Sequence, residues 1–255
     1  MAADQVGENE HKTVKVYLVA AGDYHDIDFA RLELLKLLAE NERIRVQVAA
    51  DYHDIAAIKD ADFLITYTCN LVPTEDEQAA LRDYIASGKR WFALHGTNAI
   101  LKFLDTGKVD APETAPVLME TLGTQFMGHP PIAPFTVHVS DPDHELVKGI
   151  NPFETDDELY LCRIHGDLHY LMHSRFTGKA SGFVMEDWDE DVDHPVYYIN
   201  KVGEGEVLYL NLGHCRSHYD MQPLVDFYPQ IERCAWDKPE FYELLRRGIR
   251  YCANN

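Results

Sequence analysis

Strand-like runs recur in the first half of the chain, each followed by a polar loop. The run Trp91 to Leu94 is apolar without two-residue alternation, which is typical of a strand that is buried on both faces of a parallel sheet. Between the first two runs, Phe29 to Leu38 carries apolar residues at helical spacing. This succession predicts an α/β domain with a mostly parallel sheet and helices on both of its faces. The predicted strands are Val14 to Ala20, Arg43 to Ala50, Asp62 to Thr68 and Trp91 to Leu94.

A second helix is marked at both of its ends. Thr74 and Glu77 stand three residues apart, which is the spacing of a capping box. Gly88 follows the last apolar position of the pattern, and glycine is common just past a helix end. We therefore predict a helix between Thr74 and Gly88, directly before the strand at Trp91.

Shorter elements are predicted in the second half of the chain. Its hairpin turns at Gly203-Glu204-Gly205, where the glycines suit a tight reversal. We expect this hairpin as a C-terminal addition to the parallel part of the fold. The full set is a helix at Ala111 to Leu122, a loop at Gly123 to Pro131, a strand at Phe135 to Ser140, the hairpin strands Pro195 to Asn200 and Glu206 to Leu212, and a last helix at Pro239 to Cys252.

Length and composition predict one cytoplasmic domain. The 255 residues contain no linker-like stretch, so we predict a single domain at residues 13–255 after a disordered tail at residues 1–12. The formal net charge of −20 argues against nucleic acid, whose phosphates need a basic surface, and against an anionic membrane. No apolar run is long enough for a membrane helix. Five widely spaced cysteines without a Cys-x-x-Cys pair predict reduced thiols.

Polar residues lie just past the ends of three of the predicted strands. His25 comes after the first strand, Cys69-Asn70 after the third and His95 after the fourth. Right-handed crossovers bring the carboxyl ends of parallel strands to one edge of the sheet, where α/β proteins bind ligands. We therefore expect these residues to converge. His95 is the leading candidate, because imidazole can act as a general base or a metal ligand near neutral pH.

Eight short motifs, in sequence order, resemble the ThuA-like (trehalose utilisation) family. They are Leu94-His95-Gly96-Thr97, Gly128-His129-Pro130, Asp141-Pro142-Asp143-His144, Asp157-Glu158-Leu159-Tyr160, His194-Pro195-Val196, Gly203-Glu204-Gly205-Glu206-Val207-Leu208-Tyr209, Leu212-Gly213-His214 and Leu245-Arg246-Arg247-Gly248-Ile249. The resemblance covers nearly the whole chain. It implies a flavodoxin-like, doubly wound fold of the class I glutamine amidotransferase-like type. It also implies a role in disaccharide catabolism, on glycosides oxidised to 3-keto sugars. Amidotransferase relatives carry a nucleophilic cysteine where this chain has His95, so their thiol mechanism does not carry over.

Candidate catalytic residues lie at strand ends or in runs that become apolar. Glu158 is of the second kind, and a buried carboxylate needs a partner or a raised pKa, as general acids and bases do. The predicted catalytic residues are His95, Glu158, His214 and His25. The predicted substrate-binding residues are Asp26, Gly96, Thr97, Asn98, His129, Tyr160, Arg216 and His218. For each of them a purely structural role is the alternative.

The sequence requires no cofactor but leaves a divalent metal ion open. Imidazole groups could hold such an ion against a ketone, and the ligands would then be His95, His129 and His214. A second histidine series has steps of four residues but matches no metal motif, so we interpret its members as surface or core residues. It consists of His165, His169 and His173.

The resemblance implies an enzyme that acts on a (3-keto-)glycoside or disaccharide, and the candidate residues suit histidine and carboxylate acid-base chemistry. The ketone acidifies the neighbouring C2 proton, which His95 or Glu158 could remove, while His214 or His129 protonates the departing oxygen. Two alternatives stay open: an amidohydrolase or acyl-transfer enzyme, and a non-catalytic sugar-binding module. The expected partners are a small sugar substrate and a second copy of the chain in a homodimer.

Overall fold

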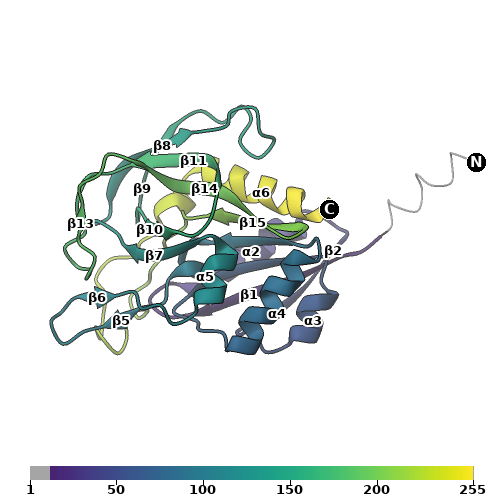
Figure 1. Cartoon of the computed structure of the whole chain (residues 1–255), viewed down its shortest axis with the longest axis horizontal. Helices are drawn as coiled ribbons and strands as arrows, with labels where there is room; N and C mark the ends of the chain where they lie inside the picture. The colour runs from purple at the N-terminus through teal and green to yellow at the C-terminus, as the bar shows by residue number, and fades with distance from the viewer. Residues whose placement is uncertain (1–11, 255) are drawn as a thin grey trace, which may run out of the picture.

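A nine-stranded mixed sheet forms the centre of the computed structural model, which describes residues 12–254 (Figure 1). The five neighbouring strands at one side of this sheet run parallel to one another, and the remaining pairings are antiparallel. The parallel part has the 2-1-3-4-5 order of flavodoxin-like sheets, so the predicted fold class is confirmed. The predicted tail, apart from residue 12, lies outside the described residues. In spatial order the strands are β2 (Ile44–Ala49), β1 (Val14–Gly22), β3 (Phe63–Cys69), β4 (Arg90–Leu94), β15 (Gly205–Leu210), β14 (Asp193–Val202), β11 (His169–Arg175), β8 (Ala133–Val139) and β9 (Phe153–Asp157).

Helices cover both faces of the parallel part of the sheet (Figure 1). One face packs against α2 (Ile27–Ala39) and α6 (Pro239–Ala253), and the other against α3 (Ile55–Asp60), α4 (Glu75–Ala86) and α5 (Pro116–Leu122). Trp91 and Phe92 are neighbours on β4, yet their side chains enter opposite cores because successive strand residues point to opposite faces. The central strands therefore lack alternation, as their sequence indicated.

Short strand pairs and 3-10 turns complete the fold. Residues of several of these short elements surround the carboxyl ends of the parallel strands, among them Phe103, Val109 and Phe126. The pairs are β7 (Thr124–Gly128) with β10 (Leu161–Ile164), β5 (Lys102–Phe103) with β6 (Val109–Asp110), and β12 (Gly178–Lys179) with β13 (Asp187–Trp188). The turns are η1 (His95–Asn98), directly after β4, and η2 (Cys234–Asp237), just before α6.

The capping box at the start of α4 is confirmed. The Thr74 hydroxyl accepts a hydrogen bond from the Glu77 backbone N–H, and the Glu77 carboxylate accepts one from the Thr74 N–H. The helix predicted from Ala111, in contrast, begins only at Pro116. Proline has no N–H to donate and a φ angle that suits the first helical turn, so it marks the true start.

The loop predicted at Gly123 to Pro131 is wrong over its first half. Gly123 ends α5 with a φ of 86°, a left-handed conformation that glycine adopts readily. The chain then turns directly into β7, which pairs with β10. A short strand whose partner lies far away in the sequence has no local signal strong enough to separate it from a loop.

The predicted hairpin is confirmed and belongs to the central sheet. β14 and β15 pair antiparallel, and β15 also pairs in parallel with β4, where Leu210 lies opposite Leu94. The segments that follow β4 and β15 therefore begin side by side. The loops after β1 and β3 are joined as well, since the Asp23 N–H donates a hydrogen bond of 3.0 Å to the carbonyl of Cys69.

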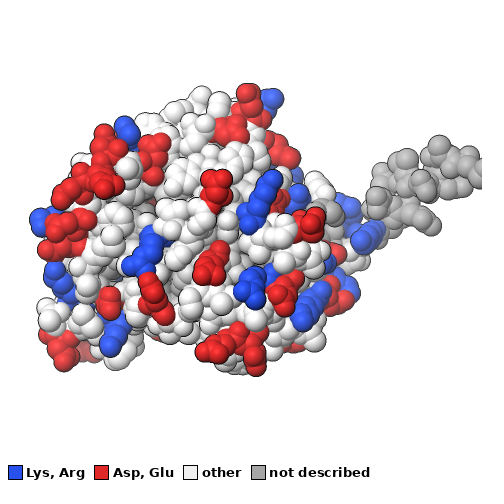
Figure 2. Space-filling view, in the orientation of Figure 1, with Lys and Arg blue, Asp and Glu red and all other residues white. Residues whose placement is uncertain are grey.

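Charged side chains of both signs lie on the face that Figure 2 shows. Figure 2 shows Asp and Glu side chains scattered over the face in view, with Lys and Arg lying among them. This distribution matches the acidic net charge of −20. Among the described residues, no helix combines the length and the apolar character that crossing a membrane requires.

Candidate active site

His95 occupies a sharp turn between β4 and η1. Its φ angle of 42° is in the left-handed region, which residues other than glycine rarely adopt. Gly96 allows this turn to sit against β3, because a Cβ atom at that position would lie 2.6 Å from the carbonyl oxygen of Thr68. The Tyr209 hydroxyl also fixes the turn, donating to the His95 carbonyl and accepting from the Asn98 N–H at 2.6 and 2.7 Å. Strained backbone held this firmly is typical of functional positions.

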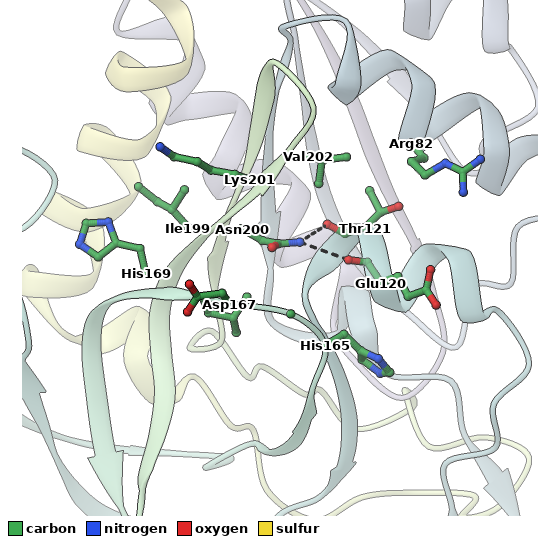
Figure 3. Close-up of a pocket in the computed structure, with 12 residues that line it drawn as sticks. Arg82, Glu120, Thr121, His165, Asp167, His169, Ile199, Asn200, Lys201 and Val202 are labelled. Carbon is green, nitrogen blue, oxygen red and sulfur yellow. Dashed lines mark hydrogen bonds between the residues drawn. The ribbon is translucent and has the colours of Figure 1, made fainter.

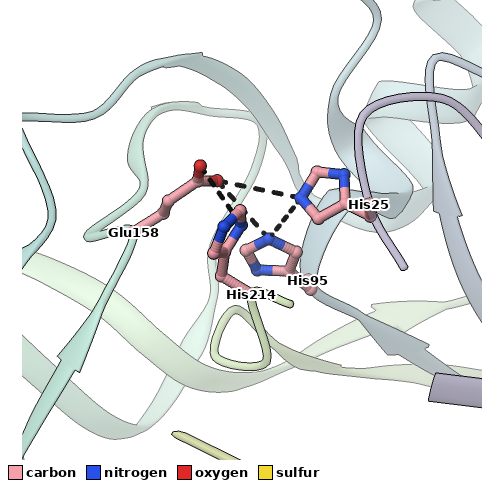
Figure 4. A group of neighbouring side chains, drawn as sticks. All are labelled: His25, His95, Glu158 and His214. Atoms are coloured by element: carbon pink, nitrogen blue, oxygen red, sulfur yellow. Dashed lines mark hydrogen bonds and ion pairs between the residues drawn. The ribbon is translucent and has the colours of Figure 1, made fainter. Parts of the chain in front are cut away.

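Four buried side chains meet beside this turn, and Figure 4 shows them pointing toward one another. The His25 and His95 Nε2 atoms are 2.9 Å apart. Glu158 Oε2 lies 3.5 Å from His95 Nε2 and 3.8 Å from His25 Nε2, while Oε1 lies 3.2 Å from His214 Nδ1. We call His25, His95, Glu158 and His214 the four-residue cluster. Its members come from the loops after β1, β4, β9 and β15, so the expected convergence of strand ends is observed.

Each imidazole of the cluster is also held on its outer side. His95 Nδ1 lies 2.9 Å from the Asn211 carbonyl, and His25 Nδ1 lies 3.2 Å from the Asp23 carbonyl. His214 Nε2 lies 2.8 Å from the carboxylate of Glu232. These contacts fix the ring orientations and direct the other nitrogen of each ring toward the centre of the cluster.

Asp157 ties together the segments that carry the cluster. Its carboxylate accepts hydrogen bonds from the backbone N–H groups of Gly213, His214 and Ala235, at 3.0, 3.1 and 3.2 Å, and from that of Glu158 at 2.8 Å. A carboxylate that receives several backbone N–H groups is a strong local constraint. Asp157 therefore positions Glu158 and His214 relative to each other.

The charges of the cluster are strongly coupled. Burial by itself disfavours an ionised Glu158, but electrostatic interactions with His129 and His214 and hydrogen bonds with His214 and His25 hold the pKa of Glu158 well below its usual range. Burial likewise opposes a charged His214, yet the carboxylates of Glu158 and Glu232 raise its pKa to about 9. Burial lowers the pKa of both His25 and His95. Without a metal ion, the Glu158 carboxylate thus lies beside the neutral imidazoles of His25 and His95 and the protonated imidazole of His214.

A pocket of about 180 Å³ opens in front of the cluster. Two cluster members, His25 and Glu158, form part of its lining, whereas His95 and His214 are fully buried behind them. Its other polar groups are His129, Tyr160 and Arg216. The remaining walls are mostly apolar or aromatic: Tyr24, Cys69, Ala99, Leu101, Phe103, Val109, Phe126, Phe183 and Met221. Mostly apolar walls with a few converging polar groups are the usual composition of a small-molecule site.

Three of the predicted substrate-binding residues, His129, Tyr160 and Arg216, line this pocket, and each lies close to the cluster. His129 Nε2 and Arg216 Nη2 lie 3.4 and 3.5 Å from Glu158 Oε1. The Tyr160 hydroxyl lies 3.2 Å from His95 Nε2. The metal ligands predicted from the sequence were His95, His129 and His214. The side chains whose donor atoms all lie within 4.8 Å of one another are instead His25, His95, Glu158 and His214, so His129 is not among them.

The other predicted substrate-binding residues lie outside the pocket lining, and this corrects the prediction. Asp26 caps α2 by accepting from the Phe29 N–H at 3.1 Å, and it also pairs with Arg233 at 3.0 Å. His218 stacks on Phe227. Gly96, Thr97 and Asn98 are neighbours of His95 in the sequence, but the turn directs them into the core. There the Thr97 hydroxyl donates to the Leu94 carbonyl at 2.8 Å and the Asn98 amide donates to Thr124 at 2.6 Å.

Several residues of the site were not expected from the sequence. Glu232 is one: it accepts hydrogen bonds from both His214 and Arg216, but it lies in a loop without regular pattern. Asp157 is another, although its place beside Glu158 in the Asp-Glu-Leu-Tyr motif was an available signal. Phe126 and Phe183 form the pocket walls from segments that only the tertiary fold brings together.

The second histidine series contributes to a different hollow. This wider depression has a volume of about 900 Å³, and its lining includes His165 and His169 but no member of the four-residue cluster. Figure 3 shows the side chains that line it. Its Asn200 amide donates to the carbonyls of Glu120 and Thr121. His169 is bonded to Asp141 at 2.8 Å and His173 to Ser140 at 2.7 Å. Among the described residues, the series is not part of the group whose donor atoms lie close enough together to share a metal ion.

The cysteines near the pocket are poor nucleophiles. Burial raises the pKa of the Cys69 thiol, which lines the pocket. Burial also raises the pKa of Cys215 to about 12, and its Sγ lies 3.1 Å from the Tyr67 hydroxyl. Because the thiolate is the reactive form of cysteine, neither environment favours an acyl-transfer mechanism.

Comparison with known proteins gives one family and several similar folds. The ThuA family model, described as trehalose utilisation, matches residues 13–228. ThuA-like proteins from Parabacteroides merdae and Bacteroides uniformis are each 16% identical, with TM-scores of 0.60 and 0.63; each alignment covers 95% of this chain and 90% or 92% of the other. A cytoplasmic protein from Salmonella typhimurium is 12% identical with a TM-score of 0.51, over 93% of this chain and 98% of the other. No curated protein matches the sequence. At these identities the structural likenesses concern the fold.

Proposed function

This chain belongs to the ThuA (trehalose utilisation) family, and from that premise we propose that it is an enzyme acting on a glycoside already oxidised to its 3-keto form. The membership itself gives a role related to trehalose utilisation. The oxidised substrate and the reaction are the proposal. The observation that carries it is Glu158, whose carboxylate lies within 3.8 Å of four imidazoles and one guanidinium at the pocket floor.

The pocket suits one sugar ring. Its volume of about 180 Å³ is comparable to that of a hexose. The aromatic walls can contact the apolar C–H faces of the ring, while the floor offers several hydrogen-bonding groups. Phe103 and Met221 also belong to the lining, and Phe103 is 39% exposed. The second sugar of a disaccharide would leave the pocket past Phe103.

An oxidised glycoside can be cleaved there by proton transfers alone. The ketone at C3 acidifies the proton on C2, and a base removes it. The electron pair forms a C1–C2 double bond as the glycosidic oxygen leaves C1 and takes up a proton. Water then adds across this bond, with hydroxyl on C1 and hydrogen on C2, so that the net reaction is hydrolysis. Imidazoles beside one carboxylate suit this chemistry better than the two facing carboxylates of ordinary glycosidases.

His129 is the group best placed to remove the C2 proton. Its Nδ1 lies 2.7 Å from the Pro130 carbonyl, which can only accept, so Nδ1 carries the hydrogen and Nε2 can take up a proton. Glu158 lies 3.4 Å from Nε2 and would stabilise the resulting imidazolium. Tyr160 and Arg216 can donate hydrogen bonds to the oxygens that gain charge. The sequence also favoured His95 and His214 for these steps, but both are fully buried behind the pocket lining and would not contact the substrate.

The four-residue cluster is the part of the site toward which the ketone would point. Negative charge grows on the ketone oxygen as the C2–H bond breaks, and the guanidinium of Arg216, which lines the pocket 3.5 Å from Glu158, provides a positive charge there that lowers the barrier. Of the two alternatives raised by the sequence, the acyl-transfer enzyme is disfavoured by its protonated thiols. The sugar-binding module is distinguished by experiment.

The test compares one disaccharide before and after oxidation at C3. We expect the protein to release free sugar only from the oxidised form. His129→Gln and Glu158→Gln should each lower kcat by about 100-fold or more. His169→Gln should leave kcat unchanged, because His169 pairs with Asp141 away from the pocket. Equal turnover of the unoxidised disaccharide, or unchanged rates in both pocket variants, would overturn the proposal. A rise in Tm with sugar, without consumption, would identify a binding module instead.

A further inference from the structure

We propose that His25, His95, Glu158 and His214 bind one divalent transition-metal ion. The binding of the ion is an inference from these four residues alone. Only its role toward a substrate, given below, rests on the proposed function. The four donor atoms all lie within 4.8 Å of one another, and all four residues are buried.

The spacing of the donor atoms fits a small ion. A tetrahedral zinc site with bonds of about 2.0–2.1 Å has neighbouring ligand atoms about 3.3 Å apart. Here the separations are 2.9 Å for His25 to His95, 3.5 Å for His95 to Glu158 and 3.8 Å for His25 to Glu158. His214 lies 3.2 Å from the other oxygen of the same carboxylate. The widest separation in the set is at most 4.8 Å, so side-chain shifts of up to about an ångström would bring the four groups to bonding distance of one centre.

The hydrogen bonds of His25 and His95 leave two lone pairs facing each other. The carbonyls of Asp23 and Asn211 can only accept, so each ring donates from Nδ1. In neutral rings both Nε2 atoms are then unprotonated and lie 2.9 Å apart, and the Tyr160 hydroxyl, 3.2 Å from His95 Nε2, can donate to only one of the two lone pairs. A hydrogen bond between them would oblige one ring to give up its carbonyl. A cation shared by both lone pairs removes this conflict.

His214 provides an independent observation of the same kind. Its Nε2 lies 2.8 Å from the Glu232 carboxylate, which directs Nδ1 toward the cluster. There Nδ1 is fully buried and has no hydrogen bond of acceptable geometry, although Glu158 Oε1 is 3.2 Å away. A carboxylate bonded to the outer nitrogen of an imidazole is the usual outer-shell arrangement of metal-binding histidines. The outer nitrogens of His25 and His95 are bonded to backbone carbonyls instead.

The donor types select the class of metal. Three imidazoles and one carboxylate suit zinc, manganese, iron or cobalt, whereas magnesium and calcium prefer sites made of oxygen. Because His25 and Glu158 line the pocket, the ion would have one side toward it, as catalytic metal sites do. If the proposed function holds, the ion supplies the positive charge that stabilises the ketone oxygen, and His129 remains free to move the proton.

The test uses the purified full-length protein, stripped with a chelator and titrated with Zn²⁺ and with Co²⁺, without any sugar. We expect one ion per chain by calorimetry, and visible absorption of Co²⁺ typical of a four- or five-coordinate site. His25→Ala and Glu158→Gln should weaken binding by about 100-fold or more, and Glu232→Gln by about 10- to 100-fold, as expected for an outer-shell partner. His169→Gln, outside the cluster, should bind like the wild type.

Circular dichroism and the Tm of each stripped variant show whether it is folded, and Glu158→Gln and Glu232→Gln keep the shape of the side chain. Failure to bind either ion, or wild-type affinity in both Glu158→Gln and His25→Ala, would overturn the metal site. The result is separate from that of the sugar assay. A protein that binds zinc here but leaves 3-keto sugars intact would keep the metal site and refute the proposed function. A protein that cleaves 3-keto sugars but binds neither ion would keep the proposed function and refute the metal site.

Discussion

The Nε2 atoms of His25 and His95 lie 2.9 Å apart, although the two residues are 70 positions apart in the sequence. Each ring is tied by its other nitrogen to a backbone carbonyl. The contact arises because β1 and β4 end at the same edge of the sheet, so buried strands set the spacing of the groups that follow them. The chemistry of the site thus depends on a few turns that the sheet holds rigidly.

Gly96 is required by the packing of the turn that carries His95. A Cβ atom at position 96 would lie 2.6 Å from the Thr68 carbonyl oxygen and 2.9 Å from the Cys69 Cβ, so the backbone would have to move. We expect Gly96→Ala to lower the free energy of unfolding by about 1–3 kcal/mol, measured by urea denaturation. Gly182→Ala is the control, because nothing lies within 4 Å of a Cβ atom there. Equal stabilities of the two variants would contradict this account of the turn.

Asp157 is expected to contribute to stability because it gathers four backbone N–H groups. An asparagine would direct its own N–H₂ group at some of these donors and leave them unsatisfied. Asp157→Asn should therefore lower the free energy of unfolding by about 1–3 kcal/mol. Its exposed neighbour gives a matched control, and Asp156→Asn should change stability by less than about 0.5 kcal/mol. A stable Asp157→Asn protein would show that the loops are held by other contacts.

The contact between His53 and Glu77 should make stability depend on pH. The hydrogen bond with Glu77 raises the pKa of His53. For Glu77, burial raises the pKa, but hydrogen bonds from His53 and Thr74 outweigh it and lower the pKa overall. Because the folded pKa of His53 exceeds its unfolded value of about 6.5, its contribution is present below that pH and lost as pH rises through the folded pKa.

We therefore predict that His53→Gln is less stable than the wild type near pH 5.5–6 and equally stable near pH 9, conditions chosen about the ordinary histidine pKa of roughly 6.5. Urea denaturation at the two pH values measures the difference. Thr74→Ala serves as the comparison, because losing a hydroxyl cap should cost a similar amount at both. A deficit of His53→Gln that persists unchanged at pH 9 would rule out the charged contact.

The sequence predicts the parts of this molecule that follow local rules. Apolar runs mark the central parallel strands, such as Phe63–Cys69 and Arg90–Leu94, and the crossover rule then places His25 and His95 at one edge. The capping box at Thr74 is equally local. The same reasoning indicated Glu158 from its apolar neighbours and His214 from the end of a strand, so all four cluster residues were candidates before their contacts were known.

The remaining features depend on contacts that no local pattern encodes. The strand Thr124–Gly128 exists because β10 pairs with it from a distant part of the sequence. Glu232 joins the site only because its loop folds back onto His214. Thr97 and Asn98 were expected to reach a substrate through their position beside His95. The left-handed turn at His95 directs them into the core, and a backbone angle of this kind carries no signature in the residue type.

The most direct test of the central claim is isotope incorporation during cleavage of a 3-keto disaccharide in D₂O. Proton removal from C2, followed by addition of water, predicts that the 3-keto monosaccharide product carries deuterium at C2 from the earliest time points. NMR spectroscopy measures this, and the product alone in D₂O, with and without protein, corrects for later exchange. A cleaved product that retains its original hydrogen at C2 would contradict the claim, because direct hydrolysis at C1 leaves that bond intact.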